Sequence, residues 1–399
     1  MPAVPVERRD DPAEIDYSRV GLISAAHLSN DLYGNLMTSL TPYLVIRGDI
    51  STAAAGFILL AYLIGSSALQ PIFGLISDRT GYRSFAVLGP VVMGAAASAF
   101  GWASGSLTLL GLAFFGGIGT AAFHPQAASM VDALSRRRKG WSMAIFSMGG
   151  NIGFALGPLA AAALAIAGLH WSVAFIVPGV VVALLLARYA PQTATSEEEF
   201  DGAALLNSVR RAWRRLSLIV AVIAVRSGVQ YLLIIFLPLY YHARGFSPEL
   251  GSYFAFVLSI AGAFGGLIGG NLSDKYGRRS IVVVSLLITA PLLLVSLLAT
   301  GAVVWPLLAL TGIFLLASNS VTVVQGQEVL PLNTGVASGV TMGLGFGLSG
   351  IVATAGTTLA QHIGVESAIF LLPILPLVGA LLAIPVPDHR PVLRSAVPA

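Results

Sequence analysis

The sequence predicts an all-α integral membrane protein, with 12 transmembrane helices arranged in two pseudo-symmetric six-helix bundles. Hydrophobic residues make up 56% of the 399 residues and charged residues only 10%, which is far from the balance of a water-soluble domain. One ten-residue pattern also occurs twice, and its second copy, at Gly270, begins 196 positions after the first copy at Gly74. The same offset separates Pro42 from Pro238, so the chain is predicted to be an internal duplication.

Apolar runs long enough to cross about 30 Å of hydrocarbon follow one another along the chain. In the first half they fall near 20–42, 52–77, 84–104, 107–131, 140–168 and 171–188. In the second half they fall near 217–241, 247–272, 280–299, 303–327, 334–361 and 366–385. We therefore expect an amino-terminal bundle at 17–188 and a carboxy-terminal bundle at 217–388. A polar linker at 189–216 with an amphipathic segment joins them, and tails at 1–16 and 389–399 flank them.

Basic residues predict the orientation of the chain in the membrane. Only Arg47 and Arg244 fall in connections on the side opposite the tails, and Arg226 falls within a span. The positive-inside rule then places both termini and the linker in the cytoplasm, as in a multi-pass protein of the inner (plasma) membrane. The net charge of +4 follows from this topology, and no clustered basic face indicates nucleic-acid binding. The polar start of the chain predicts no removable secretory peptide.

The repeated pattern falls in the turn between the second and third span of each half. Glycine lets the chain reverse tightly, aspartate can accept hydrogen bonds from a neighbouring helix start, and basic side chains remain in headgroup water. The turn is either an ordinary charged loop or a latch that holds one face of the protein shut, and the matched second copy favours the latch. The offset also relates Asp132 to Glu328. The predicted latch residues are Gly74, Asp78, Arg79, Gly81 and Arg83 in the first copy and Gly270, Asp274, Lys275, Gly277 and Arg279 in the second.

This Gly-x-x-Ser-Asp-Arg-x-Gly-x-Arg pattern resembles the signature of the major facilitator superfamily. The resemblance covers the chain from roughly 17 to 388. It implies a secondary transporter in which two six-helix bundles give alternating access to a central site.

Polar side chains at membrane depth are costly and therefore informative. In the first span, His27, Asn30 and Asp31 share one helix face. In the seventh span, Arg226 and Gln230 share a face, and Arg226 lies 196 positions after Asn30. A buried charge costs roughly 2.5–3.5 kcal/mol on insertion scales, so a partner or water must compensate it. We predict that Asp31 and Arg226 face one polar cavity between the halves; the alternative is a static ion pair that joins helices.

Histidines and aromatic residues extend this predicted site. Pro125 in the fourth span should kink the helix and free carbonyl groups beside His124. A histidine can exchange protons near neutral pH, but it can also simply donate a hydrogen bond to such carbonyls. We predict proton coupling at Asp31, His124 and His27. The predicted substrate-binding residues are Asn30, Tyr33, Gln126, Asn151, Arg226, Gln230 and Tyr231, although the tyrosines would equally suit core packing.

Glycines in the fifth span predict close helix packing. Gly153 and Gly157 form a close-contact stripe, and Pro158 bends the helix directly after it. The arrangement resembles the antiporter motif of the superfamily, except that Ala160 and Ala161 replace the usual trailing glycine pair. Glycine spacing of this kind is also common in ordinary membrane packing.

Three segments together resemble the fosmidomycin-resistance family of drug exporters. They are His27-Leu-Ser-Asn-Asp31, the run from Gly119 to Pro125, and the run from Phe146 to Pro158. The resemblance implies that Asp31 and His124 take part in proton-coupled export and that Arg226 lines the second half of the cavity. The chain departs from the family at Gln126, where an acidic residue is usual, and at Ser129, where a basic residue is usual. These departures leave substrate and proton stoichiometry open.

Transport is predicted to be passive or coupled to an ion gradient, because the sequence shows no site for a nucleotide. No nucleotide-binding Gly-x-x-x-x-Gly-Lys-Ser/Thr motif occurs, and no metal-ligand spacing or nucleophile motif predicts an enzyme or a cofactor.

We expect a monomer whose partners are a small-molecule substrate, protons and membrane lipids. The favoured function is proton-coupled export, or antiport, of a small amphiphilic or anionic compound such as an antibiotic. Proton-coupled uptake or facilitated diffusion of a metabolite is the alternative, and a non-transporting membrane enzyme or receptor is a third.

Overall fold

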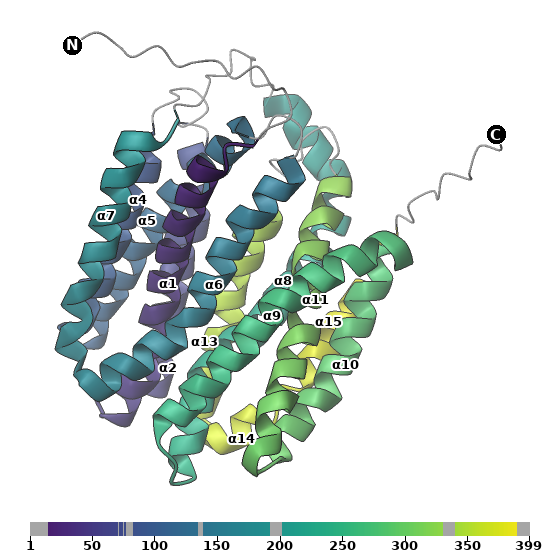
Figure 1. The fold of residues 1–399 in the computed structure, drawn as a ribbon. Helices are drawn as coiled ribbons and strands as arrows, with labels where there is room; N and C mark the ends of the chain where they lie inside the picture. The colour runs from purple at the N-terminus through teal and green to yellow at the C-terminus, as the bar shows by residue number, and fades with distance from the viewer. Residues whose placement is uncertain are drawn as a thin grey trace.

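A computed structural model of the chain describes residues 15–70, 72–74, 76, 83–134, 139–191, 202–329 and 340–388. Figure 1 shows that these residues form two groups of long, roughly parallel helices. The amino-terminal bundle consists of α1 (Tyr17–Ile46), α2 (Thr52–Ala68), α4 (Ser84–Phe100), α5 (Ser106–Ala133), α6 (Lys139–Ala167) and α7 (Ile176–Tyr189), with a 3-10 turn, η1 (Leu169–Phe175), before α7.

The carboxy-terminal bundle repeats this order. It consists of α8 (Gly202–Ala243), α9 (Pro248–Tyr276), α10 (Arg278–Leu298), α11 (Val304–Val329), α13 (Gly345–Ile363) and the pair α14 (Val365–Ile369) and α15 (Ile374–Ala383). A 3-10 turn, η2 (Gly301–Val303), precedes α11, and a π-helical turn, η3 (Val340–Leu344), precedes α13. In the described residues no strand occurs, so the predicted all-α fold is confirmed.

The duplication is visible in the backbone conformation of the turns. Gly105 and Gly168 have φ values of +80° and +110°, and their counterparts 196 positions later, Gly301 and Gly364, have φ values of +70° and +84°. Only glycine adopts positive φ without a steric penalty. The same two turns are therefore built in the same way in both halves, as an ancestral duplication requires.

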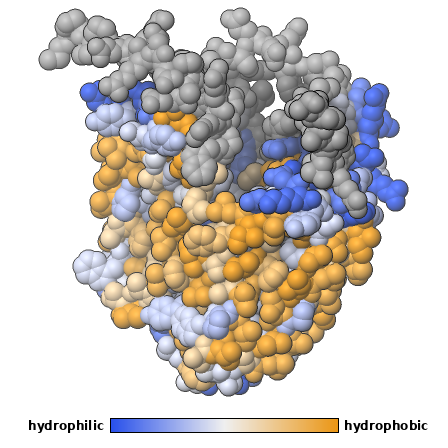
Figure 2. Space-filling view, turned by 45° about the vertical axis from the view of Figure 1, so that its right-hand side comes forward, coloured by the Kyte–Doolittle hydropathy of each residue, from blue (hydrophilic) through white to orange (hydrophobic). Residues whose placement is uncertain are grey.

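The outer surface suits a bilayer. Ten helical segments are long and apolar enough to cross a membrane; with α1 and the shorter apolar α4, the described residues provide twelve, six in each bundle. Large side chains such as Leu107, Leu184 and Leu381 are more than half exposed, which is favourable only against lipid. Figure 2 shows the resulting hydrophobic band, with hydrophilic residues toward the end where α1 begins.

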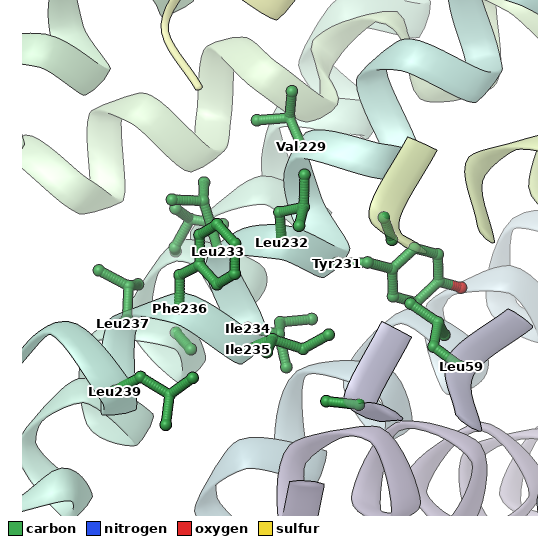
Figure 3. Packing of buried hydrophobic residues seen from close by; sticks show 14 of the residues in the cluster. Leu59, Val229, Tyr231, Leu232, Leu233, Ile234, Ile235, Phe236, Leu237 and Leu239 are labelled. Carbon is green, nitrogen blue, oxygen red and sulfur yellow. The ribbon is translucent and has the colours of Figure 1, made fainter. Parts of the chain in front are cut away.

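Helix α8 is the most buried membrane segment. Most of its apolar side chains from Val229 to Leu239 are enclosed by other helices, as Figure 3 shows. The helix also starts earlier than the sequence analysis predicts, at Gly202 instead of near 217, so the second part of the predicted linker is a helical extension. Arg214 and Arg215 are exposed on this extension, which explains why a hydropathy pattern alone excludes it from the span.

The two bundles meet on the side away from the termini. Tyr43 near the end of α1 and Ser252 at the start of α9 share a hydrogen bond of 2.8 Å between their hydroxyl oxygens. Thr354 of α13 donates to the carbonyl oxygen of Gly56 in α2 at 3.0 Å. Among the described residues, the recorded hydrogen bonds between bundles all lie on this side. The structure is therefore closed there.

Candidate functional site

Two histidines enclose a membrane-embedded carboxylate in the amino-terminal bundle. His27 Nε2 lies 3.2 Å from Asp31 Oδ2, because the two residues are one helical turn apart on α1. His124 of α5 completes the cluster, with its Nε2 3.3 Å from Asp31 Oδ1 and 2.9 Å from His27 Nε2. About a fifth of the Asp31 and His124 side-chain surface is exposed. We call His27, Asp31 and His124 the histidine–aspartate cluster.

The second ring nitrogen of each histidine is held by the backbone. His27 Nδ1 donates to the carbonyl oxygen of Phe146 in α6 at 2.8 Å, and the His27 ring stacks on the Phe146 ring. His124 Nδ1 donates to the carbonyl oxygen of Thr120 at 3.1 Å, one turn earlier on α5. Each histidine therefore donates to a carbonyl and directs its other nitrogen toward Asp31, and proton exchange at these rings stays a prediction.

A glycine on α6 provides the space for this arrangement. A methyl group added at Gly150 would lie 2.5 Å from His27 Nε2 and 2.7 Å from Asp31 Oδ2. Gly153 and Gly157 continue the same contact, since their Cα atoms pack against the α1 backbone at Leu28 and Asn35. The glycine stripe therefore brings α6 onto α1 and allows the cluster to fit between them.

A polar chain leads away from the cluster. Asn30 donates to Asp31 Oδ1 at 3.3 Å and to the Thr120 hydroxyl at 3.2 Å. The Thr120 hydroxyl in turn lies 3.4 Å from the hydroxyl of Tyr62 on α2. The carboxylate is thus connected to three helices of its own bundle.

The carboxy-terminal bundle contains a buried permanent cation. Arg226 is buried on α8, and its Nη2 donates to Asn319 Oδ1 of α11 at 2.9 Å. Its Nε has no hydrogen-bond partner among the described residues. The described residues contain no ion pair between Arg226 and Asp31, so the static pair that sequence analysis left open is not formed. Instead, the Asp31 carboxylate is in contact with the two histidines.

Tyr231 lies between these two centres. It is on α8, its ring packs edge-to-face against Phe154 of α6, and its phenol is within electrostatic reach of both Asp31 and Arg226. Figure 3 shows the Tyr231 ring beside Leu59 of α2. Tyr231 therefore bridges the boundary between the bundles.

Other predicted site residues lie elsewhere. Tyr33 is buried within the amino-terminal bundle and donates its hydroxyl to the Phe175 carbonyl, and Gln126 accepts a hydrogen bond from the Ala86 amide. Both hydrogen bonds lie inside one bundle, and the substrate-binding role predicted for Tyr33 and Gln126 stays a prediction. Asn151 is half-buried on α6, and Gln230 is buried on α8. Neither joins the histidine–aspartate cluster.

The second copy of the latch pattern forms a tie within the carboxy-terminal bundle. Arg278 at the start of α10 pairs with Asp274 at the end of α9 and, at 3.2 Å, with Glu328 of α11. Gly277, with φ +93°, makes the turn between α9 and α10. Asp274 thus accepts a hydrogen bond from the start of a neighbouring helix, and the pairing holds three helices of one bundle together.

The neighbouring basic position donates to a carbonyl group at the end of the sixth span in both halves. Arg83 at the start of α4 donates to the carbonyl of Ala190 at 3.0 Å, and Arg279 donates to the carbonyl of Ile384 at 3.4 Å. Each arginine thus ties the third span of its bundle to the end of the sixth. Asp78, Arg79 and Gly81 of the first copy lie outside the described residues.

Several residues of the site escape sequence reasoning. Thr120, Tyr62 and Asn319 are ordinary polar residues of apolar spans, and only helix packing brings them to the ionisable groups. Gly150 lies in the glycine run of the fifth span, but its role depends on which α1 side chain faces it. Glu328 is the exception, because the 196-residue offset already relates it to Asp132.

The donor set of the cluster, two imidazoles and a carboxylate, is one that transition metals also use. Two nitrogen ligands about 2.0–2.1 Å from a tetrahedral zinc ion lie roughly 3.3 Å from each other. The two Nε2 atoms lie closer, at 2.9 Å, which is a hydrogen-bond distance. The spacing therefore suits a hydrogen bond between the two rings better than joint coordination of a zinc ion.

Comparison with known proteins gives consistent results. The family model described as Major Facilitator Superfamily matches residues 23–354. The fosmidomycin resistance protein of Escherichia coli K12 is 28% identical over 95% of both chains, and the uncharacterized MFS-type transporter YfnC of Bacillus subtilis is 28% identical over 93% of both. The fold is similar, with a TM-score of 0.70 and 17% identity over 92% of this chain and 96% of the other, to an inward-facing bacterial homologue of the lysosomal transporter Spinster. The chain belongs to the major facilitator superfamily of membrane transporters.

Proposed function

We propose that this transporter exports a small amphiphilic or anionic compound in exchange for protons. The observation that supports this function is the histidine–aspartate cluster, with all three groups within 3.3 Å of one another at membrane depth. An ionisable carboxylate in a span is expensive, and proton relays are a common reason for its presence. Histidine adds a group that gains and loses protons near neutral pH.

Arg226 is the proposed anion-binding residue. A buried guanidinium has five donors, and here the recorded side-chain partner is the neutral Asn319. With the Nε donor unpartnered, an anionic substrate group would supply both the missing acceptor and the missing counter-charge. Tyr231 and Phe154 would form an aromatic wall beside that group.

The relative from Escherichia coli supports export of a drug-like compound. Its name identifies it as a fosmidomycin resistance protein, and the similarity extends over 95% of each chain. We propose fosmidomycin as the first probe substrate. We also propose that both termini face the cytoplasm of the inner membrane, since the basic turns and tails then lie on the inside.

The inward movement of one proton provides enough free energy to drive export of the compound. Its movement through about 100 mV is worth about 2.3 kcal/mol, and a tenfold proton gradient adds roughly 1.4 kcal/mol. Together they sustain a substrate gradient on the order of 500-fold.

Proton-coupled uptake is the second candidate function, and one observation favours it. Arg226 and Asp31 have different partners, so an anion and a proton would not compete for the same charge. Both could then be carried together, as symport requires.

Proton flux in sealed proteoliposomes tests the proposal and separates the candidates. Vesicles are loaded with fosmidomycin and a pH-sensitive dye, then diluted into fosmidomycin-free buffer. Antiport predicts that the interior acidifies as the compound leaves, and symport predicts that it becomes alkaline. Fosmidomycin efflux without any pH change would contradict proton coupling.

A further inference from the structure

We infer that His27 and His124 share a single transferable proton, so that the histidine–aspartate cluster carries one proton in each transport cycle. The inference rests on the proposed proton coupling. It concerns the stoichiometry of the site, which the sequence leaves open, and it follows from the hydrogen-bond partners of the four ring nitrogens.

The two Nδ1 atoms are fixed as donors. Each lies at hydrogen-bond distance from a backbone carbonyl oxygen, at 2.8 Å for His27 and 3.1 Å for His124. A carbonyl oxygen accepts but never donates, so each Nδ1 must carry a hydrogen. Both Nδ1 hydrogens are therefore present at all times and take no part in proton transfer.

The two Nε2 atoms can then hold only one hydrogen between them. They lie 2.9 Å apart, and a hydrogen bond at that distance needs one donor and one acceptor. With no hydrogen, two lone pairs would face each other beside the carboxylate. With two hydrogens, two imidazolium rings would face each other, and the contact would have to open. The compact cluster is thus the singly protonated state.

Among the described residues, the surroundings of the cluster offer no second site for a proton. The other ionisable groups near the cluster are the phenols of Tyr62 on α2 and Tyr231 on α8, and phenols are uncharged at neutral pH. The described contacts of helix α6 with the cluster are the Phe146 ring and carbonyl group and the Gly150 backbone, none of which is ionisable. Beyond Tyr231, Arg226 keeps its charge. Asp31 and one shared proton therefore give a net charge of zero, and loss of the proton gives a net charge of −1.

A proton count on purified protein in detergent micelles tests this inference without any substrate. The protons taken up between pH 9 and pH 5 are measured by titration for the wild type, His27→Gln, His124→Gln and the triple variant His27→Gln/Asp31→Asn/His124→Gln. A shared site predicts that each single variant takes up as many protons as the wild type, because the remaining histidine takes the proton. The triple variant should take up about one proton fewer.

Two exposed histidines provide the control. His242 and His362 lie at helix ends away from the cluster. The variant His242→Gln/His362→Gln removes two histidines that lie outside the cluster, so its change in proton count shows what independent side chains contribute. This variant calibrates the count on the same protein.

A loss of one proton in each single variant would overturn the inference, as would a loss of two protons in the triple variant. If the triple variant fails to fold, the single variants alone decide. Coupled transport with independent histidines would refute the shared proton but not the proposed function. A shared proton combined with uncoupled transport would refute the proposed function and leave the site intact.

Discussion

The two bundles share one design but differ in their membrane charges. In the amino-terminal bundle the ionisable groups are His27, Asp31 and His124, which can gain and lose a proton. The positions 196 residues later are Ile223, Ser227 and Ser320, none of which is ionisable near neutral pH. The carboxy-terminal bundle instead has Arg226, whose charge is permanent. One half thus contains the histidine–aspartate cluster and the other a fixed cation. This difference matches the proposed division between energy coupling and substrate recognition.

The largest expected effect is the loss of coupling when the amino-terminal site is neutralised. Asp31→Asn removes the carboxylate that both histidines face, so proton-coupled flux in proteoliposomes should fall to background while the protein still inserts and folds. Thermal unfolding would check that the variant is folded, because removing one partner of a buried charged pair can itself destabilise a protein. Full coupling in this variant would remove Asp31 from the mechanism.

The next largest effect concerns recognition in the carboxy-terminal bundle. Arg226→Ala should weaken binding of an anionic probe by roughly 10- to 150-fold, since a hydrogen bond to a charged group is worth about 1.5–3 kcal/mol. Titration calorimetry with an anionic and a cationic compound would measure the difference. The matched control is Arg244→Ala, at an exposed arginine beyond the end of α8. Equal losses for both compounds would contradict charge recognition.

A smaller effect is expected from crowding the cluster without changing its charges. Gly150→Ala places a methyl group against His27 and Asp31, and the stacked Phe146 ring limits how far His27 can retreat. We expect a destabilisation of roughly 1–3 kcal/mol, as for other overpacked sites, and a several-fold loss of coupled flux. Gly111→Ala is the control, because no atom lies within 4 Å of its added methyl group. If both variants behave alike, the space at Gly150 has no role.

The smallest effect is expected at the turn between α9 and α10. Asp274→Asn breaks the contact with Arg278 while Glu328 keeps its own. Exposed ion pairs contribute about 0–1 kcal/mol, so the transport rate should fall by no more than roughly fivefold at unchanged substrate affinity. Asp49→Asn, which breaks an exposed pair with Arg47 at the opposite end, should leave the rate unchanged. A changed affinity at a normal rate would contradict a role in conformational exchange.

The fold and part of the site could be predicted from the sequence because they depend on local patterns. Composition and the 196-residue offset predict the two bundles, and the helical period places His27 and Asp31 on one face. By contrast, the contact between His27 and His124 spans 97 residues, and that between Arg226 and Asn319 spans 93. Such contacts depend on how helices rotate against one another, which a periodicity does not define.

Two tyrosines show the same limit of prediction from sequence. Tyr33 and Tyr231 are both aromatic residues near membrane-depth charges, and the sequence predicts both as cavity walls or core residues alike. The structure turns Tyr33 toward η1 in its own bundle and Tyr231 toward α6 of the other bundle. Whether such a tyrosine points into its own bundle or toward the other bundle depends on how its helix is rotated, and the sequence does not define that rotation.

The central claim is that proton coupling belongs to one bundle and substrate recognition to the other. It is tested most directly by the pH dependence of fosmidomycin binding in wild type, Asp31→Asn and Arg226→Ala. We predict that wild-type affinity varies with pH, that Asp31→Asn binds with an affinity that no longer varies, and that Arg226→Ala binds weakly but keeps the pH dependence. If Asp31→Asn loses binding altogether, or if Arg226→Ala abolishes the pH dependence, the two charges act as one site and the division is wrong.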